Sequence, residues 1–368
     1  MTKHDYKQTA YYILYLIRCV LQNKVPSNDK IEKMDMALLY KVAEDHSLSA
    51  IVAYALETAH VHISAFEDAK NRAIKKCILF DYEREKILAE LEAAGIWYMP
   101  LKGVILKELY PRIGMRQMCD NDILFDKKYQ ASVKLIMQGL GYDVISYRVG
   151  CNDKYNKLPV LNFEMHHSLF SEGHEKQFYD YYNDIKNKLF SETDNGYSYR
   201  FTDEDFYIYM IVHEYKHYRD GGTGLRSLVD EYVYINKYSS KLNMSYIETE
   251  LKKLGIFEFE KNQRILSKKI MCGVKLEKYE KEILDYIIFS GTYGNIENHV
   301  KNKAGFTISS KICYLFHRVF ITMPQIKSSY PFFNDYKFLL PILPAYRLVK
   351  LLTVSRKRII SELKVLFG

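Results

Sequence analysis

Two aspartates separated by one residue are the side chains in this sequence that most clearly suggest chemistry. Asp120 and Asp122 flank Asn121 in the stretch MCDNDILFD, whose alternation of polar and apolar residues predicts a strand. Because side chains alternate across a strand, both carboxylates point to one face, about 7 Å apart at the backbone. Two hard oxygen ligands suit Mg²⁺, which completes its shell with water and substrate phosphates. The spacing therefore suggests phosphoryl or nucleotidyl transfer, and a solvated strand end is the alternative.

Two further features strengthen this interpretation. Glu164, in the predicted strand LNFEMHH, would bring a third carboxylate from a neighbouring strand. Lys102 and Gly103 lie at a predicted strand-to-helix turn, where phosphates are commonly bound. The predicted order is a strand, a K-G turn, a helix, a strand with D-x-D and a later strand with an acid. This layout resembles that of the DNA polymerase beta-like nucleotidyltransferases.

The elements that must position these residues divide the chain into four segments. Residues 1–94 carry apolar residues at helical spacing, and residues 95–170 change to short strands and helices, with strands predicted for WYMPLKG, MCDNDILFD, YDVISY and PVLNFEMH. Helical spacing returns in residues 171–300, and residues 301–368 form a basic, aromatic segment. We predict an α+β fold, with a small mixed sheet and its helices as a nucleotidyltransferase core, flanked by N- and C-terminal helical regions.

The clearest single helix is predicted for TDEDFYIYMIVHEYKHYRDGG. Thr202 is placed to cap its first turn, Asp205 has the capping-box spacing, and Gly221 supplies a stop. The GGTG of residues 221–224 follows no strand and precedes no G-K-S/T, so we expect an interhelical turn there.

An ordered set of motifs extends the resemblance to a family. Three stretches in order resemble a bacterial family of uncharacterised nucleotidyltransferases: PLKGVILKELYPRIGMRQMCDNDILF, FEMHHSLF and HEYKHYRDGGTGLRSLVD. The pattern of that family runs L-K-G, Y-P, R-x-M-x-D-x-D-x-L, E-x-H, and H-x-x-K-H followed by Gly and Asp. The likeness covers most of the chain from about Trp97, and MPQIKSSYPFFNDYKFLLPILPAYRLVKLL resembles the closing segment of that family.

The resemblance implies a two-metal Mg²⁺ site and an NTP substrate. Asp120, Asp122 and Glu164 would hold the metal, and Lys102 and Gly103 would face the triphosphate. A nucleoside monophosphate would pass to an acceptor that stays open among small molecules, proteins and RNA. The sequence departs from the superfamily in having Lys-Gly in place of Gly-Ser, and Asn121 in place of an aliphatic residue. An inactive descendant is the alternative that these departures raise.

Arg116 and His166 are two further candidates near the acids. Arg116 lies four residues before Asp120 and would neutralise phosphate charge, and the alternative is an exposed cation. His166 shares a strand face with Glu164, so it would touch substrate or serve as a hydrogen-bonded structural histidine.

A competing motif lies in the helix after Thr202. His213-Glu214-Tyr215-Lys216-His217 matches H-E-x-x-H, in which two histidines bind zinc and the glutamate activates water, and Glu231 is available as a third ligand. This makes a zinc metallopeptidase the rival function. Lys216 opposes zinc electrostatically, and the family pattern already accounts for H-x-x-K-H. We therefore expect this helix to line the nucleotide or acceptor cleft, with His213, Lys216 or His217 reaching phosphate. We expect Asp230 to orient the acceptor or to face solvent.

The overall composition is that of an ordinary globular protein. The chain has 368 residues, of which 48% are hydrophobic and 27% charged, and this excludes a disordered or fibrous chain. Six scattered cysteines without a C-x-x-C pair, and a start of MTKHDYKQ without a signal peptide, predict a cytoplasmic location. We expect no transmembrane helix, because the apolar runs are short or broken by Arg18 and by prolines.

Positive charge gathers at one end of the chain. Residues 300–368 contain 12 Lys and Arg against two acids, a net charge of +10, which leaves the first 299 residues near −2. VSRKRIISELKVLFG predicts a basic amphipathic helix, so contact with an anionic membrane surface, contact with RNA, and packing on the core are three interpretations. Packing is favoured because Pro331, Pro341 and Pro344 divide the segment into short pieces. A non-catalytic nucleic-acid-binding module stays a further alternative for the whole chain.

Overall fold

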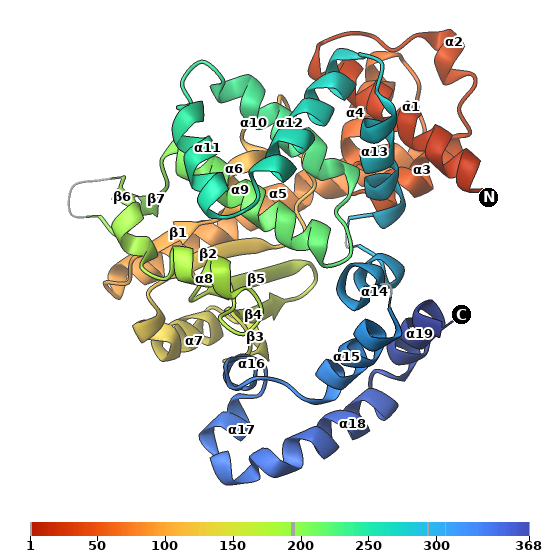
Figure 1. Ribbon diagram of the computed structural model, residues 1–368. Coiled ribbons are helices and arrows are strands. Elements are labelled where there is room, and N and C mark those ends of the chain that lie inside the picture. The colour runs from red at the N-terminus through yellow and green to blue at the C-terminus, as the bar shows by residue number, and fades with distance from the viewer. Residues whose placement is uncertain (1, 193–195, 293, 306, 368) are drawn as a thin grey trace.

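A five-stranded mixed sheet forms the centre of the fold in the computed structural model, which describes residues 2–192, 196–292, 294–305 and 307–367 (Figure 1). Its strands are β1 Tyr98–Pro100, β2 Asn121–Phe125, β3 Asp143–Ser146, β4 Asn152–Lys157 and β5 Leu161–His166, in the order β1-β2-β5-β4-β3. The pair β2 and β5 is parallel, and the other pairs are antiparallel. With helical regions before and after this small sheet, the predicted α+β fold class is confirmed.

One strand of this sheet was not predicted. β4 has the sequence NDKYNK, which is rich in residues that strands usually avoid. It forms because Tyr155 is fully buried and because both neighbours, β3 and β5, pair with it. Tertiary contacts therefore decide the conformation of this segment against its local composition.

The two faces of the sheet have different roles. Ile123, Phe125, Phe163 and Met165 are almost fully buried on one face, together with Phe80 of the long helix α5 Ser64–Ala93. Asp122, Glu164 and His166 alternate with these residues and so lie on the opposite face. Two helices complete the connections inside this region: α6 Lys102–Lys107 joins β1 to β2, and α7 Gln130–Gly139, preceded by the 3₁₀ turn η1 Lys127–Tyr129, joins β2 to β3.

The N-terminal helices do not pack as a separate unit. They are α1 Lys3–Leu21, α2 Asn28–Ile31, α3 Met36–Asp45, α4 Ser49–Thr58 and α5. Ile13 and Ile17 of α1 share a hydrophobic core with Leu225, Leu266 and Leu284, which come from three helices after the sheet. The four-segment division of the chain stays a prediction, and this shared core joins the first segment to the third.

The segment after the sheet is mainly helical. It contains α8 Lys176–Tyr182, the 3₁₀ turn η2 Ile185–Lys188, the short hairpin β6 Phe190–Ser191 and β7 Tyr199–Arg200, α9 Asp203–Arg219, α10 Leu225–Tyr238, α11 Met244–Lys253, α12 Phe257–Cys272 and α13 Lys278–Ser290. The Thr202 side chain accepts a hydrogen bond from the Asp205 backbone amide at 3.0 Å, so the predicted cap of α9 is confirmed. Gly221 and Gly222, with φ of 146° and 112°, turn the chain into α10, as expected of an interhelical turn.

The C-terminal segment forms a lobe of short helices below the sheet in Figure 1. These are α14 Ile296–Ala304, α15 Ile308–Val319, α16 Met323–Ser329, α17 Pro331–Asp335, the 3₁₀ turn η3 Lys337–Ile342, α18 Leu343–Thr353 and α19 Arg356–Phe367. Pro331 and Pro344 lie in the first turns of α17 and α18, and Pro341 lies in η3, as the prediction of short pieces requires.

The favoured interpretation that this segment packs on the core is wrong for most of its apolar side chains. Two helices dock on the rest of the protein. On α16 the Ser328 carbonyl accepts from the Gly150 amide at 2.8 Å, and the Ser328 hydroxyl lies 2.9 Å from that of Ser171. On α14 the Asn302 side chain donates to the Arg219 carbonyl at 3.0 Å. In the helices after α16, however, Phe332 and Phe338 remain 57% and 77% exposed, so much of the apolar surface there stays open to solvent.

Among the described residues, no single helix has the length and apolar character needed to cross a bilayer. One pair of segments, Lys337–Thr353 with Arg356–Phe367, meets these criteria of length and composition only when taken together, and it is bent by 90°.

Candidate active site

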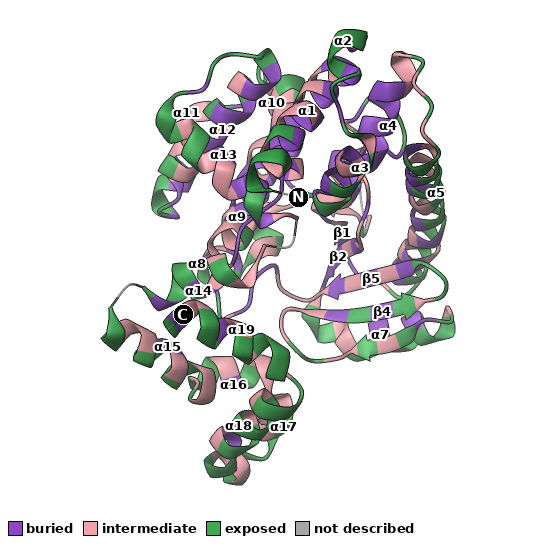
Figure 2. Ribbon diagram, turned by 90° about the vertical axis from the view of Figure 1, so that its right-hand side faces the viewer, coloured by how far each residue is buried: buried purple, intermediate pink, exposed green. Residues whose placement is uncertain are grey.

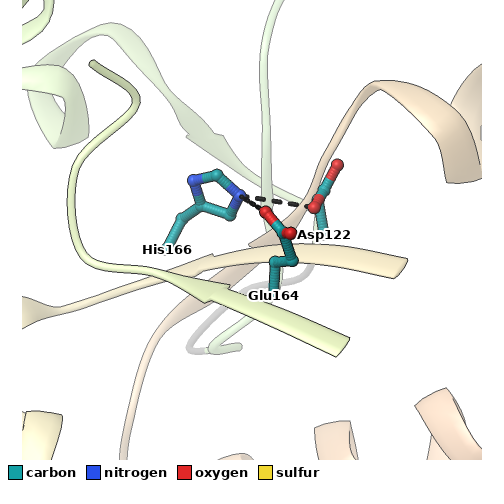
Figure 3. A group of neighbouring side chains, drawn as sticks. All are labelled: Asp122, Glu164 and His166. Atoms are coloured by element: carbon teal, nitrogen blue, oxygen red, sulfur yellow. Dashed lines mark hydrogen bonds and ion pairs between the residues drawn. The ribbon is translucent and has the colours of Figure 1, made fainter. Parts of the chain in front are cut away.

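Parallel pairing of β2 with β5 brings the predicted acids together. Asp122 lies directly opposite Glu164 in the register, and His166 follows two residues later on the same face (Figure 3). The His166 Nε2 atom is 3.3 Å from Asp122 Oδ1 and 3.8 Å from Glu164 Oε2. One potential ligand atom from each of the three side chains lies within 4.8 Å of the others. This is a donor set that fits a divalent cation.

Asp120 immediately precedes β2 and lies beside this group. Burial raises the pKa of Asp120 to about 6, and the charges of Asp122 and Glu164 add to the shift. A carboxylate that is buried next to two others is unfavourable without a cation, so this environment also fits a metal. Asn121, between the two aspartates, points into the core, where it is fully buried and its Nδ2 donates to the Phe80 carbonyl at 3.4 Å.

Two side chains of β4 complete the neighbourhood of Glu164. Lys154 lies opposite Glu164 in the β4–β5 register, and its Nζ is 2.6 Å from Glu164 Oε1. Asn152 donates to the other oxygen of the same carboxylate. Burial opposes the charged form of His166, but the hydrogen bond to Asp122 prevails and raises its pKa to about 10. Without a metal, Lys154 and protonated His166 thus place positive charge beside the acids, and His166 would have to lose its proton to act as a metal ligand.

These β4 residues were missed because β4 itself was not predicted. The alternation of Asn152, Lys154 and Asn156 along one face is the signal that would have indicated a strand. Arg226 was also missed. Its guanidinium donates to the Gln117 carbonyl at 3.1 Å, and its charge opposes the rise in the pKa of Asp120. Arg226 therefore adds a third cation near the acids, from α10.

The predicted phosphate turn lies against the strand that carries the acids. The Leu101 amide donates to the Asp122 carbonyl at 2.9 Å, and α6 begins at the next residue, Lys102. A Cβ on Gly103 would lie 3.1 Å from Met118 Cε, so a larger residue would crowd the turn. Burial lowers the pKa of Lys102, whereas the charges of Asp230 and Glu214 oppose this shift. The turn and the acids are thus placed side by side.

Arg116 is bound within the protein. Its guanidinium is buried and donates to both oxygens of Asp230, with Nε–Oδ1 at 2.8 Å and Nη2–Oδ2 at 3.0 Å. Asp230 also accepts from the Tyr110 hydroxyl at 2.8 Å. The exposed cation suggested for Arg116 is therefore wrong, and so is the solvent-facing position suggested for Asp230. An acceptor-orienting role for Asp230 stays a prediction. The ion pair of Arg116 with Asp230 joins the loop before β2 to α10. Arg116 also donates to the Gly103 carbonyl at 3.4 Å, and this contact helps to hold the predicted phosphate turn in position.

The histidines of α9 face the acid side of the sheet. The rings of His213 and His217 are 4.6 Å apart between centroids. Burial lowers the pKa of both, that of His217 to about 4, and the charges of Lys102 and Lys216 contribute to both shifts. Both rings are therefore neutral near pH 7. Lys216 lies 3.6 Å from Glu175, so part of its charge is already balanced within the protein.

Among the described residues, the two histidines of the H-E-x-x-H motif are not part of a group of three clustered ligand atoms. Glu214 is buried, and burial raises its pKa to about 7. The proposed third ligand, Glu231, instead accepts a hydrogen bond from Tyr207 at 3.0 Å. In the part of the chain that the structure describes, the group of clustered ligand atoms is that of Asp122, Glu164 and His166, without either histidine of the motif.

We therefore expect the purified protein to contain far less than one zinc ion per chain. His213→Ala should not change the metal content, because among the described residues no third ligand atom joins His213 and His217 in a cluster. Elemental analysis of the wild type, of this variant and of a control, His62→Ala, on an exposed histidine, measures the outcome. Stoichiometric zinc that disappears only in His213→Ala would favour the peptidase.

Two pockets lie in this part of the molecule. A pocket of about 440 Å³ is lined by Lys154 and Glu164 and by the turn between β4 and β5. A second pocket of about 230 Å³ is lined by Cys151 and His167, next to His166 in the sequence, and by Lys327 and Ser328 of α16. Glu164 is thus the member of the acid group that lines open space in the first pocket.

A small mixed sheet with acids on adjacent parallel strands and a turn beside them is the arrangement expected of a nucleotidyltransferase core. A sequence model of the family described as "Uncharacterised nucleotidyltransferase" matches residues 32–271, and the chain belongs to this family. The match begins well before Trp97 and ends before the C-terminal lobe. No curated protein and no solved structure matches the chain.

Proposed function

We propose that this protein transfers a nucleoside monophosphate from an NTP to an acceptor hydroxyl or phosphate, with Mg²⁺ held by Asp120, Asp122 and Glu164. The observation that carries the proposal is the direct pairing of Asp122 with Glu164 across two parallel strands. Family membership supports the class of reaction, and the group of ligand atoms from Asp122, Glu164 and His166 supports this place for it. Mg²⁺ when bound would neutralise phosphate charge and activate the attacking oxygen.

The side chains around the acids have separate roles in this proposal. The turn at Lys102 and Gly103 binds the triphosphate, because the preceding residue, Leu101, donates a backbone hydrogen bond to the Asp122 carbonyl and so holds the turn beside the acids. Lys154 is half exposed beside Glu164 and can turn toward a phosphate oxygen. His213 and His217, both neutral, line the opposite wall and donate or accept hydrogen bonds without adding charge.

The reaction then requires only positioning and charge neutralisation. The acceptor oxygen forms a bond to the α-phosphorus of the NTP, the bond from that phosphorus to the bridging oxygen breaks, and pyrophosphate leaves. When the acceptor is a hydroxyl, its proton passes to water. Arg116 does not contact phosphate in this scheme. It holds the turn and the strand in place through Asp230 and the Gly103 carbonyl.

A thermal-shift screen with the four NTPs tests the proposal directly. We expect at least one NTP to raise the melting temperature by several degrees in the presence of Mg²⁺ and to have little effect in its absence. A ligand at about 100 times its Kd stabilises a folded protein by about 2.7 kcal/mol, which such a screen detects. No shift with any Mg-NTP, or an equal shift with the metal chelated, would contradict the assignment.

A further inference from the structure

The C-terminal lobe, residues 307–367, exposes a regular series of apolar side chains. On α15 and directly after it these are Ile308, Ile312, Phe316 and Phe320, which are 74%, 58%, 55% and 46% exposed. The spacing of four residues places the first three along one side of the helix. The rings of Phe316 and Phe320 stack at 4.4 Å, so this stripe is continuous at its end.

The last turns of the lobe extend this apolar surface. Figure 2 shows exposed residues over much of α15 to α19. On and beside α18 the exposed apolar side chains are Leu348, Val349, Leu352 and Val354, and before α18 they are Phe332, Phe338 and Ile342. Few apolar side chains of this lobe are buried, namely Tyr314, Ile326, Leu343 and Leu366. An exposed apolar surface of this extent marks a site of interaction.

The exposed surface is fixed in place by polar contacts within the lobe. Arg347 of α18 donates to the Val319 carbonyl at the end of α15 at 2.9 Å and to the Tyr330 hydroxyl at 2.8 Å. Glu362 of α19 is fully buried and lies 3.1 Å from Arg318 and 3.0 Å from Arg358. The exposed apolar side chains therefore belong to a braced arrangement of helices.

The C-terminal lobe also carries an excess of exposed positive charge. The exposed cations of the lobe are Lys327, Lys337, Lys350, Arg356, Lys357, Arg358 and Lys364. Asp335 is the exposed acid among the described residues of the lobe, and Glu362 is buried. The surface thus combines an excess of positive charge with isoleucine, leucine, valine and phenylalanine.

The exposed apolar side chains and the excess of positive charge together indicate which kind of partner this surface binds. A second copy of the chain would bring another positive lobe to the contact and be repelled. Nucleic acid would match the charge, but it offers nothing to the branched aliphatic side chains of α15 and α18. An anionic bilayer offers phosphate groups to the cations and an apolar phase to the exposed side chains.

We propose that the C-terminal lobe binds the surface of an anionic lipid bilayer. The apolar side chains of α15 and α18 enter the boundary between headgroups and acyl chains, and the lysines and arginines bind lipid phosphates. Attachment is at the surface, because Arg356, Lys357 and Arg358 follow one another at the 90° bend between α18 and α19 and stay with the headgroups. This proposal is independent of the proposed nucleotidyl transfer.

Vesicle flotation with the full chain tests it. We expect the protein to float with vesicles in which about one lipid in three is anionic, to float poorly with purely zwitterionic vesicles, and to lose much of its binding at about 0.5 M salt. Ile312→Ser combined with Leu352→Ser should weaken partitioning at least about tenfold, because both side chains would no longer enter the bilayer. Leu135→Ser, on α7 and 70% exposed, is the matched control and should bind like the wild type.

Each other outcome would overturn the proposal. Equal binding of the double variant and the Leu135→Ser control would show that the apolar stripes are not involved. Salt-sensitive binding of single-stranded RNA without binding to anionic vesicles would assign the lobe to nucleic acid. A dimer in sedimentation experiments that is lost in the double variant, again without vesicle binding, would assign it to a second copy. Melting curves confirm that the variants are folded.

Discussion

Asp122→Asn should abolish Mg²⁺-dependent stabilisation by NTP and lower any transferase activity at least about a hundredfold. Asp122 is the strand residue paired with Glu164, so its loss leaves a single carboxylate in the opposing pair. Asp120→Asn should have the same effect on Mg-NTP binding. Without ligand, Asp120→Asn should be as stable as the wild type or slightly more so, because one of three clustered negative charges is removed. Asp122→Asn should be somewhat less stable than Asp120→Asn, because it also loses the ion pair with His166. Thermal shift with and without Mg-NTP measures both effects.

Asp143→Asn provides the control for these variants. Asp143 lies on the edge strand β3 of the same sheet and is exposed, away from the acid group. It should respond to Mg-NTP like the wild type. Wild-type binding of Mg-NTP by either Asp120→Asn or Asp122→Asn would show that the nucleotide site lies elsewhere.

Asp230→Leu should destabilise the protein by about 3–5 kcal/mol, the largest effect on stability that we expect of one substitution. The substitution leaves the Arg116 guanidinium buried without the two oxygens of the Asp230 carboxylate that accept its hydrogen bonds. Removing both charges in Arg116→Met with Asp230→Leu should recover most of the loss, since neither member of the buried ion pair is left without its partner. Urea unfolding gives the free energies.

An exposed ion pair serves as the comparison for this buried one. Glu297 and Lys301 are more than half exposed and lie one helical turn apart, so Glu297→Gln should change stability by less than about 0.5 kcal/mol. A similarly small effect for Asp230→Leu would mean that Arg116 is free to move to solvent. The role of Arg116 in positioning the phosphate turn would then be wrong.

Local patterns predicted the elements that carry the site. The alternation around Asp122 and Glu164 correctly indicated β2 and β5, and Thr202 correctly indicated the start of α9. These signals lie within a few residues of the element they predict, so they are readable in one sequence. The assignment of Asp120, Asp122 and Glu164 to a metal stays a prediction.

Contacts between distant residues were not predictable in the same way. The partner of Arg116 is Asp230, which lies 114 residues further along the chain. From the sequence alone, Arg116 was expected to contact phosphate or to face solvent. Neither alternative included an ion pair with a buried acid from another helix. The same applies to Lys154, whose contact with Glu164 depends on a strand with unfavourable composition.

The C-terminal lobe illustrates a different limit. Its prolines and its amphipathic pattern were correctly connected with short helices. The pattern gives the apolar side of a helix, but it does not identify what covers that side. Packing on the core was favoured for the segment, whereas side chains such as Phe338 remain exposed.

The pairing of β2 with β5 links the acid group to the integrity of the interior. A shift of β5 by a single position would turn Glu164 inward and expose Met165, which is now fully buried. The same shift would also remove Phe163 from its edge-to-face contact with Tyr142. Misaligned forms of this sheet would therefore carry a large energetic penalty before any ligand arrives. A chain whose sheet has the correct register therefore has Asp122 and Glu164 side by side before any ligand binds. Ligand binding does not need to drive the folding of the sheet.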